Sequence, residues 1–164
     1  MSERTHLEEI SIRNLGIIEE SHLELGKGLN VLTGETGAGK TMILTALNLV
    51  LGGKSDSALV RHGSDRLTAS ATFSVNQPVN SELAQILEEN NAVIEESQII
   101  FSRAVTAEGK SKASCNGTTV TASALADMST HLIEIHGQSA NTQLVKPAKQ
   151  RELLDRFGGA AISE

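Results

Sequence analysis

Aromatic side chains are nearly absent from this sequence of 164 residues, which contains three Phe and neither Trp nor Tyr. Because 39% of the residues are hydrophobic, we expect an aliphatic core, and a nucleotide base has no obvious aromatic platform. The single cysteine, Cys115, excludes an internal disulfide and suits a reducing compartment. We expect Cys115 to be a small buried or half-buried side chain and not a nucleophile.

Long apolar runs and an excess of positive charge are also lacking. The longest apolar run, Met42 to Leu51, is too short to span a bilayer, and Met1 to Glu9 lacks the apolar core of a signal peptide. We therefore expect a cytoplasmic protein with no membrane partner. The net charge of −6 excludes a surface wholly devoted to nucleic acid but leaves room for local basic patches. The length favours a single domain with a substantial core.

The stretch Gly34-Glu35-Thr36-Gly37-Ala38-Gly39-Lys40-Thr41 fits the phosphate-loop pattern GxxxxGK[ST]. Leu29 to Thr33 before it is typical of a buried strand, and Met42 to Leu51 after it predicts a helix. In that setting the loop N–H groups and the positive end of the helix cradle a polyphosphate. Lys40 is expected to reach the β- and γ-phosphates, and the Thr41 hydroxyl to bind Mg²⁺. A Gly-rich turn that fits the pattern by chance is the alternative.

The rest of the chain alternates between strand and helix patterns. Strands are expected at Leu7 to Asn14, Ile17 to Leu25, Leu67 to Val75, Ile99 to Thr106, Ala113 to Val120 (with a turn at Asn116-Gly117) and His131 to Ile135. Further helices are expected from Asn80 or Ser81 to Asn90, from Ser123 to Met128 and from Pro147 to Phe157. The helix Met42 to Leu51 is apolar almost all the way round, so we expect it to be buried on several sides.

A complete phosphate-loop hydrolase also needs an acidic residue at the end of a buried strand. Glu134 is the only candidate, but it lies within a predicted strand, so a solvent-facing carboxylate is the favoured interpretation. His131 and His136 point to opposite faces of that strand, which argues against a metal site. Arg13 and Asn14 could contact a base or ribose, although a solvated strand end is the simpler interpretation.

Four stretches in order resemble the RecN DNA-repair ATPases, relatives of the SMC (structural maintenance of chromosomes) proteins. They are IRNLGII at 12–18, GLNVLTGETGAGKT at 28–41, LVRHG at 59–63 and IEIHGQ at 133–138. The resemblance implies an α/β fold of the ABC/SMC type of P-loop NTPase head, split in sequence. Residues 1–145 would be its N-terminal lobe with an antiparallel β-subdomain, and residues 146–164 the root of a coiled-coil arm helix.

The same resemblance implies roles for individual residues. Gln138 would be the loop glutamine that contacts Mg²⁺ and the attacking water, acting in catalysis together with Lys40. Arg61 matches a position where SMC-like proteins approach nucleotide or DNA, and a solvated arginine is the alternative. After Gln138 the chain reads Ser139 to Gln143 where the family often has a His-rich stretch, which leaves the contacts there open. The signature motif and catalytic acid are missing, and the family carries them in a C-terminal half.

The sequence therefore predicts the ATP- and Mg²⁺-binding N-terminal half of a RecN-like ATPase acting in DNA double-strand break repair and recombination. Its expected partners are the C-terminal half of the same head, a second head joined through ATP, and DNA ends or single-stranded regions in the full protein. We expect a nucleoid-associated protein of the cytoplasm. One alternative is a self-contained nucleotide kinase, although no Arg-rich lid is visible, and another is a non-hydrolysing nucleotide-binding module.

Overall fold

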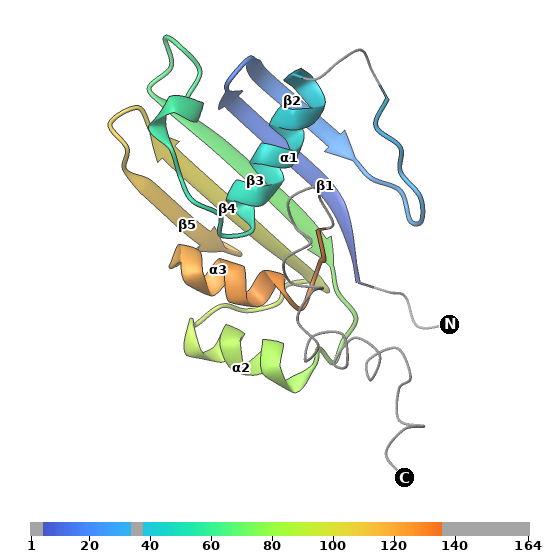
Figure 1. The fold of residues 1–164 in the computed structure, drawn as a ribbon. Helices are drawn as coiled ribbons and strands as arrows, with labels where there is room; N and C mark the ends of the chain where they lie inside the picture. Colours follow the sequence, from blue (N-terminus) through green and yellow to red (C-terminus); the bar gives the residue numbers. More distant parts are fainter. Residues whose placement is uncertain (1–4, 34–37, 136–164) are drawn as a thin grey trace, which may run out of the picture. The chain divides into compact units, whose positions relative to one another are not determined.

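The computed structural model of the chain describes residues 5–33 and 38–135. In this part of the chain, six strands form one antiparallel sheet in the order β2-β1-β3-β4-β5-β6 (Figure 1). Helices accompany this sheet, so the structure confirms the α/β class that the sequence predicts.

The first two strands form the hairpin that the sequence predicts. β1 (His6–Leu15) pairs with β2 (Ile18–Glu24), and the two residues between them close the turn. Gly16 has a φ of +55° there, a left-handed conformation that glycine adopts without strain. Both predicted strands are confirmed to within one residue at each end.

The other four strands are also confirmed. They are β3 (Arg66–Ser74), β4 (Gln98–Thr106), β5 (Ser111–Cys115) and β6 (Thr118–Val120). The predicted strand Ala113 to Val120 is divided at Asn116-Gly117, where both residues have positive φ and turn the chain back on itself.

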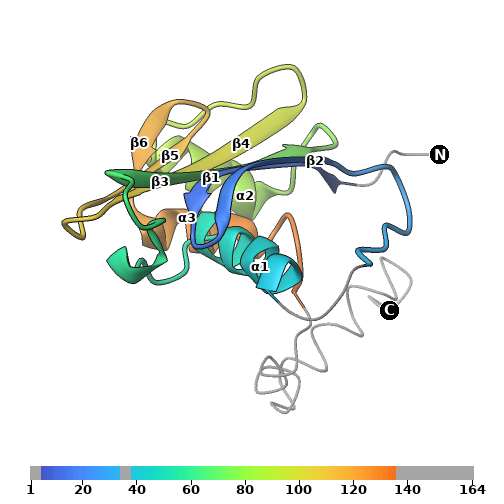
Figure 2. The ribbon, with the colours of Figure 1, turned by 90° about the horizontal axis from the view of Figure 1, so that it is seen from above.

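The sheet has one covered and one open face, because side chains alternate along each strand. On β3, Leu67, Ala69, Ala71 and Phe73 are buried, as the predicted half-exposed strand requires. Phe73 packs against Phe101 of β4, with ring centroids 5.5 Å apart. Figure 2 shows that the helices lie on one side of the sheet. The opposite face carries mainly short polar side chains.

Three helices and one short 3₁₀ turn accompany the sheet. They are α1 (Ala38–Val50), the turn η1 (Ser57–Leu59), α2 (Ser81–Glu89) and α3 (Ala122–Ser129). α1 packs on β1, β3 and β4, while α3 packs on β5 and on α2. Among the described residues, none of these helices has the length and apolar character needed to cross a membrane.

The expected burial of α1 on several sides is confirmed for most of its apolar residues, with Leu44 as the exception. Ala46, Leu49 and Val50 are buried against the sheet, but Leu44 is 59% exposed. Leu47 is buried as well, and Met42 and Ile43 pack partly buried against the core, so among the described residues Leu44 is the exposed large apolar side chain of this helix. The helix also begins at Ala38, four residues earlier than predicted.

Two predicted buried strands are absent from the described residues. In the predicted strand Leu29 to Thr33, Leu29 is 91% and Val31 70% exposed, and the segment has no strand conformation. No strand is assigned over 131–135 either. A strand needs a neighbour for its backbone N–H and C=O groups, and neither segment is paired in this sheet. The predicted loop 136–139 and helix 147–157 lie outside the described residues, as does the proposed arm 146–164.

The predicted helix from Asn80 to Asn90 begins with a well-formed cap. The Asn80 side chain accepts a hydrogen bond from the Leu83 N–H at 2.7 Å. We expect Asn80→Ala to lower the free energy of unfolding by about 1 kcal/mol, because this N–H group loses its acceptor. Denaturant unfolding followed by circular dichroism measures the change. Ser81→Ala, at the exposed first position of the helix, is the control and should be nearly neutral; an equal loss there would rule out the capping explanation.

Candidate nucleotide site

The last residues of the phosphate-loop motif lie in the first turn of α1. Gly39 and Thr41 are exposed and Lys40 is half-buried, so all three can be reached from outside the protein. The first turn carries no acidic residue, and the positive end of the helix dipole there favours an anion. Gly34, Glu35, Thr36 and Gly37 lie outside the described residues, and the side chain of Ala38 is likewise not described.

α1 itself has a rigid base. Its second half packs into the core of the sheet through Leu49 and Val50, which are 1% and 0% exposed. The Thr45 hydroxyl donates to the Thr41 carbonyl at 2.8 Å inside the helix. The helix therefore presents Lys40 and Thr41 from a fixed support.

The turn between β1 and β2 lies directly against the beginning of α1. A side chain at Gly16 would approach the sulfur of Met42 to 2.7 Å, so the turn and the first turns of the helix are in close contact. The Gly16 N–H also donates to the Leu59 carbonyl at 2.8 Å. These contacts fix the start of α1 relative to the sheet.

Arg61 closes the same turn from the other side. Its backbone N–H donates to the Asn14 carbonyl, and its guanidinium donates to the Ile17 carbonyl, both at 2.8 Å. The guanidinium also lies 3.8 Å from Glu19. Arg61 therefore stabilises the β1–β2 turn. It is not the purely solvated arginine of the alternative interpretation.

The residues considered for base contact have partners on the sheet. The Arg13 guanidinium forms an ion pair with Glu20 at 2.6 Å, and both side chains are largely exposed. The Asn14 amide donates to the Arg66 carbonyl at 3.2 Å. These contacts agree with the simpler interpretation, a solvated strand end.

The remaining candidates lie at the far end of the described chain. Glu134 is exposed and Gln138 lies outside the described residues. His131 is 3.8 Å from Glu82 and 3.4 Å from the amide of Asn80. In residues 5–33 and 38–135, no group of three or more His, Cys, Asp or Glu could hold a metal ion. Mg²⁺ would therefore have to rely on Thr41, on residues beyond this part of the chain and on the nucleotide.

Cys115 fulfils the expectation of a buried, unreactive thiol. Its side chain is fully buried on the covered face of β5. Burial raises the pKa of the thiol to about 11, so it is protonated at neutral pH and a poor nucleophile.

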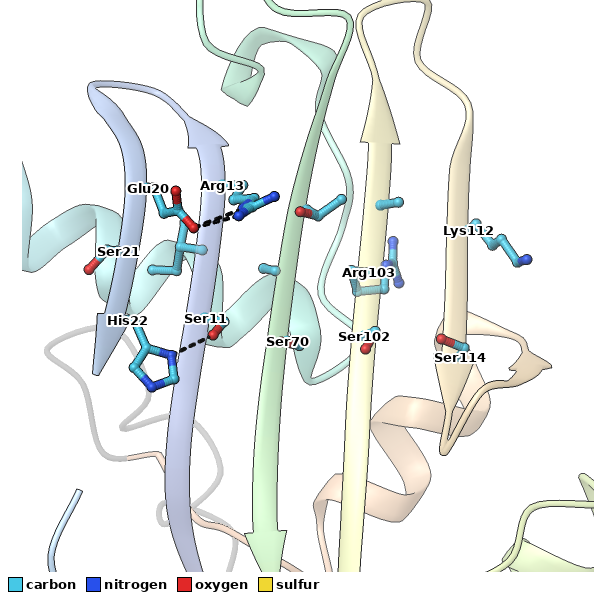
Figure 3. Close-up of a pocket in the computed structure, with 14 residues that line it drawn as sticks. Ser11, Arg13, Glu20, Ser21, His22, Ser70, Ser102, Arg103, Lys112 and Ser114 are labelled. Atoms are coloured by element: carbon cyan, nitrogen blue, oxygen red, sulfur yellow. Dashed lines mark hydrogen bonds and ion pairs between the residues drawn. The ribbon is translucent and has the colours of Figure 1, made fainter. Parts of the chain in front are cut away.

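The open face of the sheet holds a polar hollow of about 650 Å³ that sequence reasoning missed (Figure 3). Its centre is a row of hydroxyl groups on four neighbouring strands, at Ser11, Ser70, Ser102 and Ser114. His22 extends the row and lies 2.9 Å from the Ser11 hydroxyl. The alternation of serine and alanine along Leu67 to Val75 was the signal for this face.

Comparison with known proteins shows clear relatives over most of the chain. The family model of the AAA domain matches residues 9–158. The chain is 40% identical over 152 residues to the DNA repair protein RecN of Streptomyces coelicolor and 41% identical over 155 residues to that of Vibrio cholerae. These matches cover 93% and 94% of this chain but 26% and 27% of those proteins, so it spans about a quarter of their length. They confirm the resemblance that the motifs indicated.

Solved structures show the same fold at lower identity. An Smc head domain with a coiled coil and joint from Pyrococcus yayanosii has a TM-score of 0.69 at 21% identity, covering 94% of this chain and 32% of that chain. The recombination mediator RecF bound to ATP has a TM-score of 0.62 at 16% identity, covering 94% and 38%. A structure from work on ATP-driven dimerization and DNA-stimulated activation of SMC ATPases has a TM-score of 0.63 at 21% identity, covering 93% and 99%. The predicted head-type fold is therefore confirmed.

Proposed function

Because the chain belongs to the AAA-domain family, we propose that it is the ATP- and Mg²⁺-binding N-terminal half of a RecN-like ATPase head. The observation that carries this proposal is the position of Lys40 and Thr41, which complete a phosphate-loop motif and lie in the first turn of a firmly anchored helix. Residues 34–41 would hold the phosphates through backbone N–H groups and the Lys40 ammonium.

The residues present fit a magnesium ion bound together with the nucleotide. Mg²⁺ prefers oxygen ligands and is usually held by few protein groups together with phosphate oxygens. The exposed Thr41 hydroxyl supplies one such oxygen, and we assign the amide oxygen of Gln138 as a second. Bound Mg²⁺ would neutralise phosphate charge, while Lys40 orients the β- and γ-phosphates and Gln138 orients the water.

The exposed apolar segments support a second half-head as partner. Leu29 and Val31 precede the phosphate loop, and Leu44 lies on the outer side of α1, all more than half exposed. Apolar exposure on both sides of one loop is a feature of interaction surfaces. We propose that the C-terminal half of the same head covers these residues and brings the signature motif and catalytic acid. The SMC work on ATP-driven dimerization supports a further contact between two heads through ATP.

DNA is the proposed target of the complete protein. The relatives are named DNA repair proteins, and RecF is named a recombination mediator. On this chain, Arg66 and Lys112 lie on the open face near one end of the sheet, and Lys110 lies in the hairpin there. Such basic groups can contact backbone phosphates despite the acidic total charge. We propose that the complete protein acts in double-strand break repair at DNA ends or single-stranded regions. We also propose that it is located in the cytoplasm in association with the nucleoid.

The two alternatives are less well supported. A nucleotide kinase needs a second substrate site beside the phosphate loop, and the relatives are DNA repair proteins instead. A non-hydrolysing module would bind nucleotide in the same way, so only turnover by the completed head separates it from our proposal.

The magnesium contact can be tested with a pair of threonine variants. We expect Thr41→Ala to weaken ATP binding about tenfold in the presence of Mg²⁺ and to leave binding in EDTA nearly unchanged, because only a metal ligand is lost. Thr45→Ala, one turn further along α1, is the matched control and should bind like the wild type. Calorimetric titration with ATP measures both conditions. An equal loss with and without Mg²⁺ would contradict the assignment of Thr41 as a metal ligand.

A further inference from the structure

Arg103 is a buried arginine that the proposed nucleotide site does not use. It lies on the covered face of β4 between Phe101 and Val105, and its side chain is 3% exposed. Its register neighbours on the adjacent strands are Ala69 and Ala113, whose small side chains leave room for it. A long apolar side chain would fill this space equally well.

The guanidinium of Arg103 has only one of its hydrogen-bonding groups satisfied by a side chain. Nη2 donates to the Ser111 hydroxyl at 2.8 Å, whereas Nε and Nη1 have no acceptor. Within the described residues, no carboxylate forms an ion pair with Arg103. Burial lowers the pKa of the guanidinium below its ordinary value, because the charged form loses its hydration.

A buried charge with unpaired donors is costly, and proteins retain such groups mainly where a partner completes them. Replacing a buried charged group by an apolar one of similar size is often neutral or stabilising. The unpaired buried donors of Arg103 therefore point to a ligand that supplies the missing acceptors. The planar fork of an arginine matches the oxygens of a phosphate or a carboxylate.

The surroundings favour a phosphate. Ser111, the partner of Arg103, is exposed at the start of β5, so the guanidinium lies close to the surface at this hairpin. The residues on either side of Ser111 are Lys110 and Lys112, both exposed. Lys110 is 3.4 Å from Glu108, but both side chains are more than three-quarters exposed and can separate easily. Figure 3 shows Lys112 on the strand next to that of Arg103, but its side chain belongs to the open face, so Lys112 is not part of the site.

We propose that Arg103 is the buried half of a phosphate-binding site at the β4–β5 hairpin, with Ser111 as its mobile cover and Lys110 as its exposed half. The phosphate comes from a nucleic-acid backbone or from free phosphate. Only the first source rests on the proposed action on DNA, and the site is independent of the phosphate loop.

The test is carried out in a Lys40→Ala background, so that the phosphate loop contributes nothing and a failure of the proposed nucleotide site leaves the result readable. Thermal unfolding is measured in sodium phosphate and in sodium chloride of the same ionic strength. Phosphate should raise the midpoint of the Arg103-containing chain, and Arg103→Met should abolish this rise. In chloride, Arg103→Met should be at least as stable as its parent. Lys54→Met removes an exposed positive charge in the loop after α1, away from the hairpin, and should keep the phosphate effect.

A second measurement identifies the source of the phosphate. Anisotropy with a labelled DNA duplex should show roughly a tenfold loss of affinity for Arg103→Met and a salt slope smaller by about one, if a backbone phosphate is bound. Arg103→Lys keeps the positive charge but not the forked guanidinium, so its DNA affinity should lie between those of the parent chain and of Arg103→Met. Unchanged DNA binding with a lost phosphate effect would assign the site to free phosphate.

Three outcomes would overturn the proposal. The first is a large loss of stability in Arg103→Met with the phosphate effect intact, which would make the arginine purely structural. The second is no phosphate effect in the parent chain. The third is a rise in midpoint with a poly-glutamate peptide and not with phosphate, which would assign the site to an acidic protein partner.

Discussion

Replacing Lys40 by alanine is expected to weaken ATP binding at least about a hundredfold, a loss of about 2.7 kcal/mol in binding free energy. In the proposed site the Lys40 ammonium group reaches the β- and γ-phosphates, and charge-assisted hydrogen bonds to phosphate are among the strongest in proteins. The fold should survive, because Lys40 is half-buried at the beginning of α1 while the buried contacts of that helix lie further along. Titration calorimetry measures the affinity, and denaturant unfolding should change by less than about 0.5 kcal/mol.

Lys54→Ala is the control for this variant. Lys54 is an exposed lysine in the loop after α1, so its removal changes the net charge equally without touching the motif. It should bind ATP like the wild type. If Lys40→Ala retained wild-type affinity, the assignment of residues 34–41 to nucleotide phosphates would be wrong.

ATP turnover is expected to be negligible for this chain alone and to appear when the C-terminal half of the head is added. The chain supplies the phosphate-binding part, but the resemblance places the signature motif and the catalytic acid in the other half. The measurement is phosphate release over time, with ATP binding determined on the same sample. Binding without turnover, followed by turnover in the mixture, is the expected pair of results.

The Leu44→Glu variant tests whether the rescued turnover depends on contact between α1 and the C-terminal half. Leu44 is 59% exposed on the outer side of α1, so a glutamate there should leave the isolated chain folded and able to bind ATP. In the mixture it should abolish most of the rescued turnover, because a charge would be buried against the partner. Asn48→Asp, at another exposed position of α1, is the control that should permit rescue. Robust turnover by the chain alone would instead mean that the catalytic acid is present here, with Glu134 as the first residue to substitute.

The antiparallel strands could be predicted because each carries its own signal. β3 alternates between apolar and polar residues over its full length, and Asn116-Gly117 determines a turn by its backbone preference alone. The segment 29–33 has an equally strong apolar signal but is not a strand here, because strand formation depends on a neighbour that lies outside this sheet. The local sequence pattern therefore predicts which segments are apolar enough to be buried. It does not identify the residues that pack against them.

The sequence predicts the part of the candidate site that forms a contiguous motif. Lys40 and Thr41 were identified by spacing, and the structure adds the anchored helix beneath them. The hydrogen bond from the Arg61 guanidinium to the Ile17 backbone carbonyl joins residues far apart in sequence and could not be foreseen. Arg103 was missed for a different reason, since one charged residue in an otherwise alternating strand passes as an exposed position until its register is known.

The order of strands in the sheet also determines the order in which the protein can assemble. From β3 to β6, each strand pairs with the strand that follows it in the sequence. β1 instead pairs with β3, and the phosphate-loop segment and α1 lie between these two strands in the sequence. Pairing between distant segments requires closing a long loop and is slow compared with forming hairpins. We therefore expect the region β3–β6 to form first and the hairpin β1–β2 to join it in a later step. Because Gly16 of that hairpin contacts Met42, the phosphate-binding helix reaches its final position only when this last step is complete.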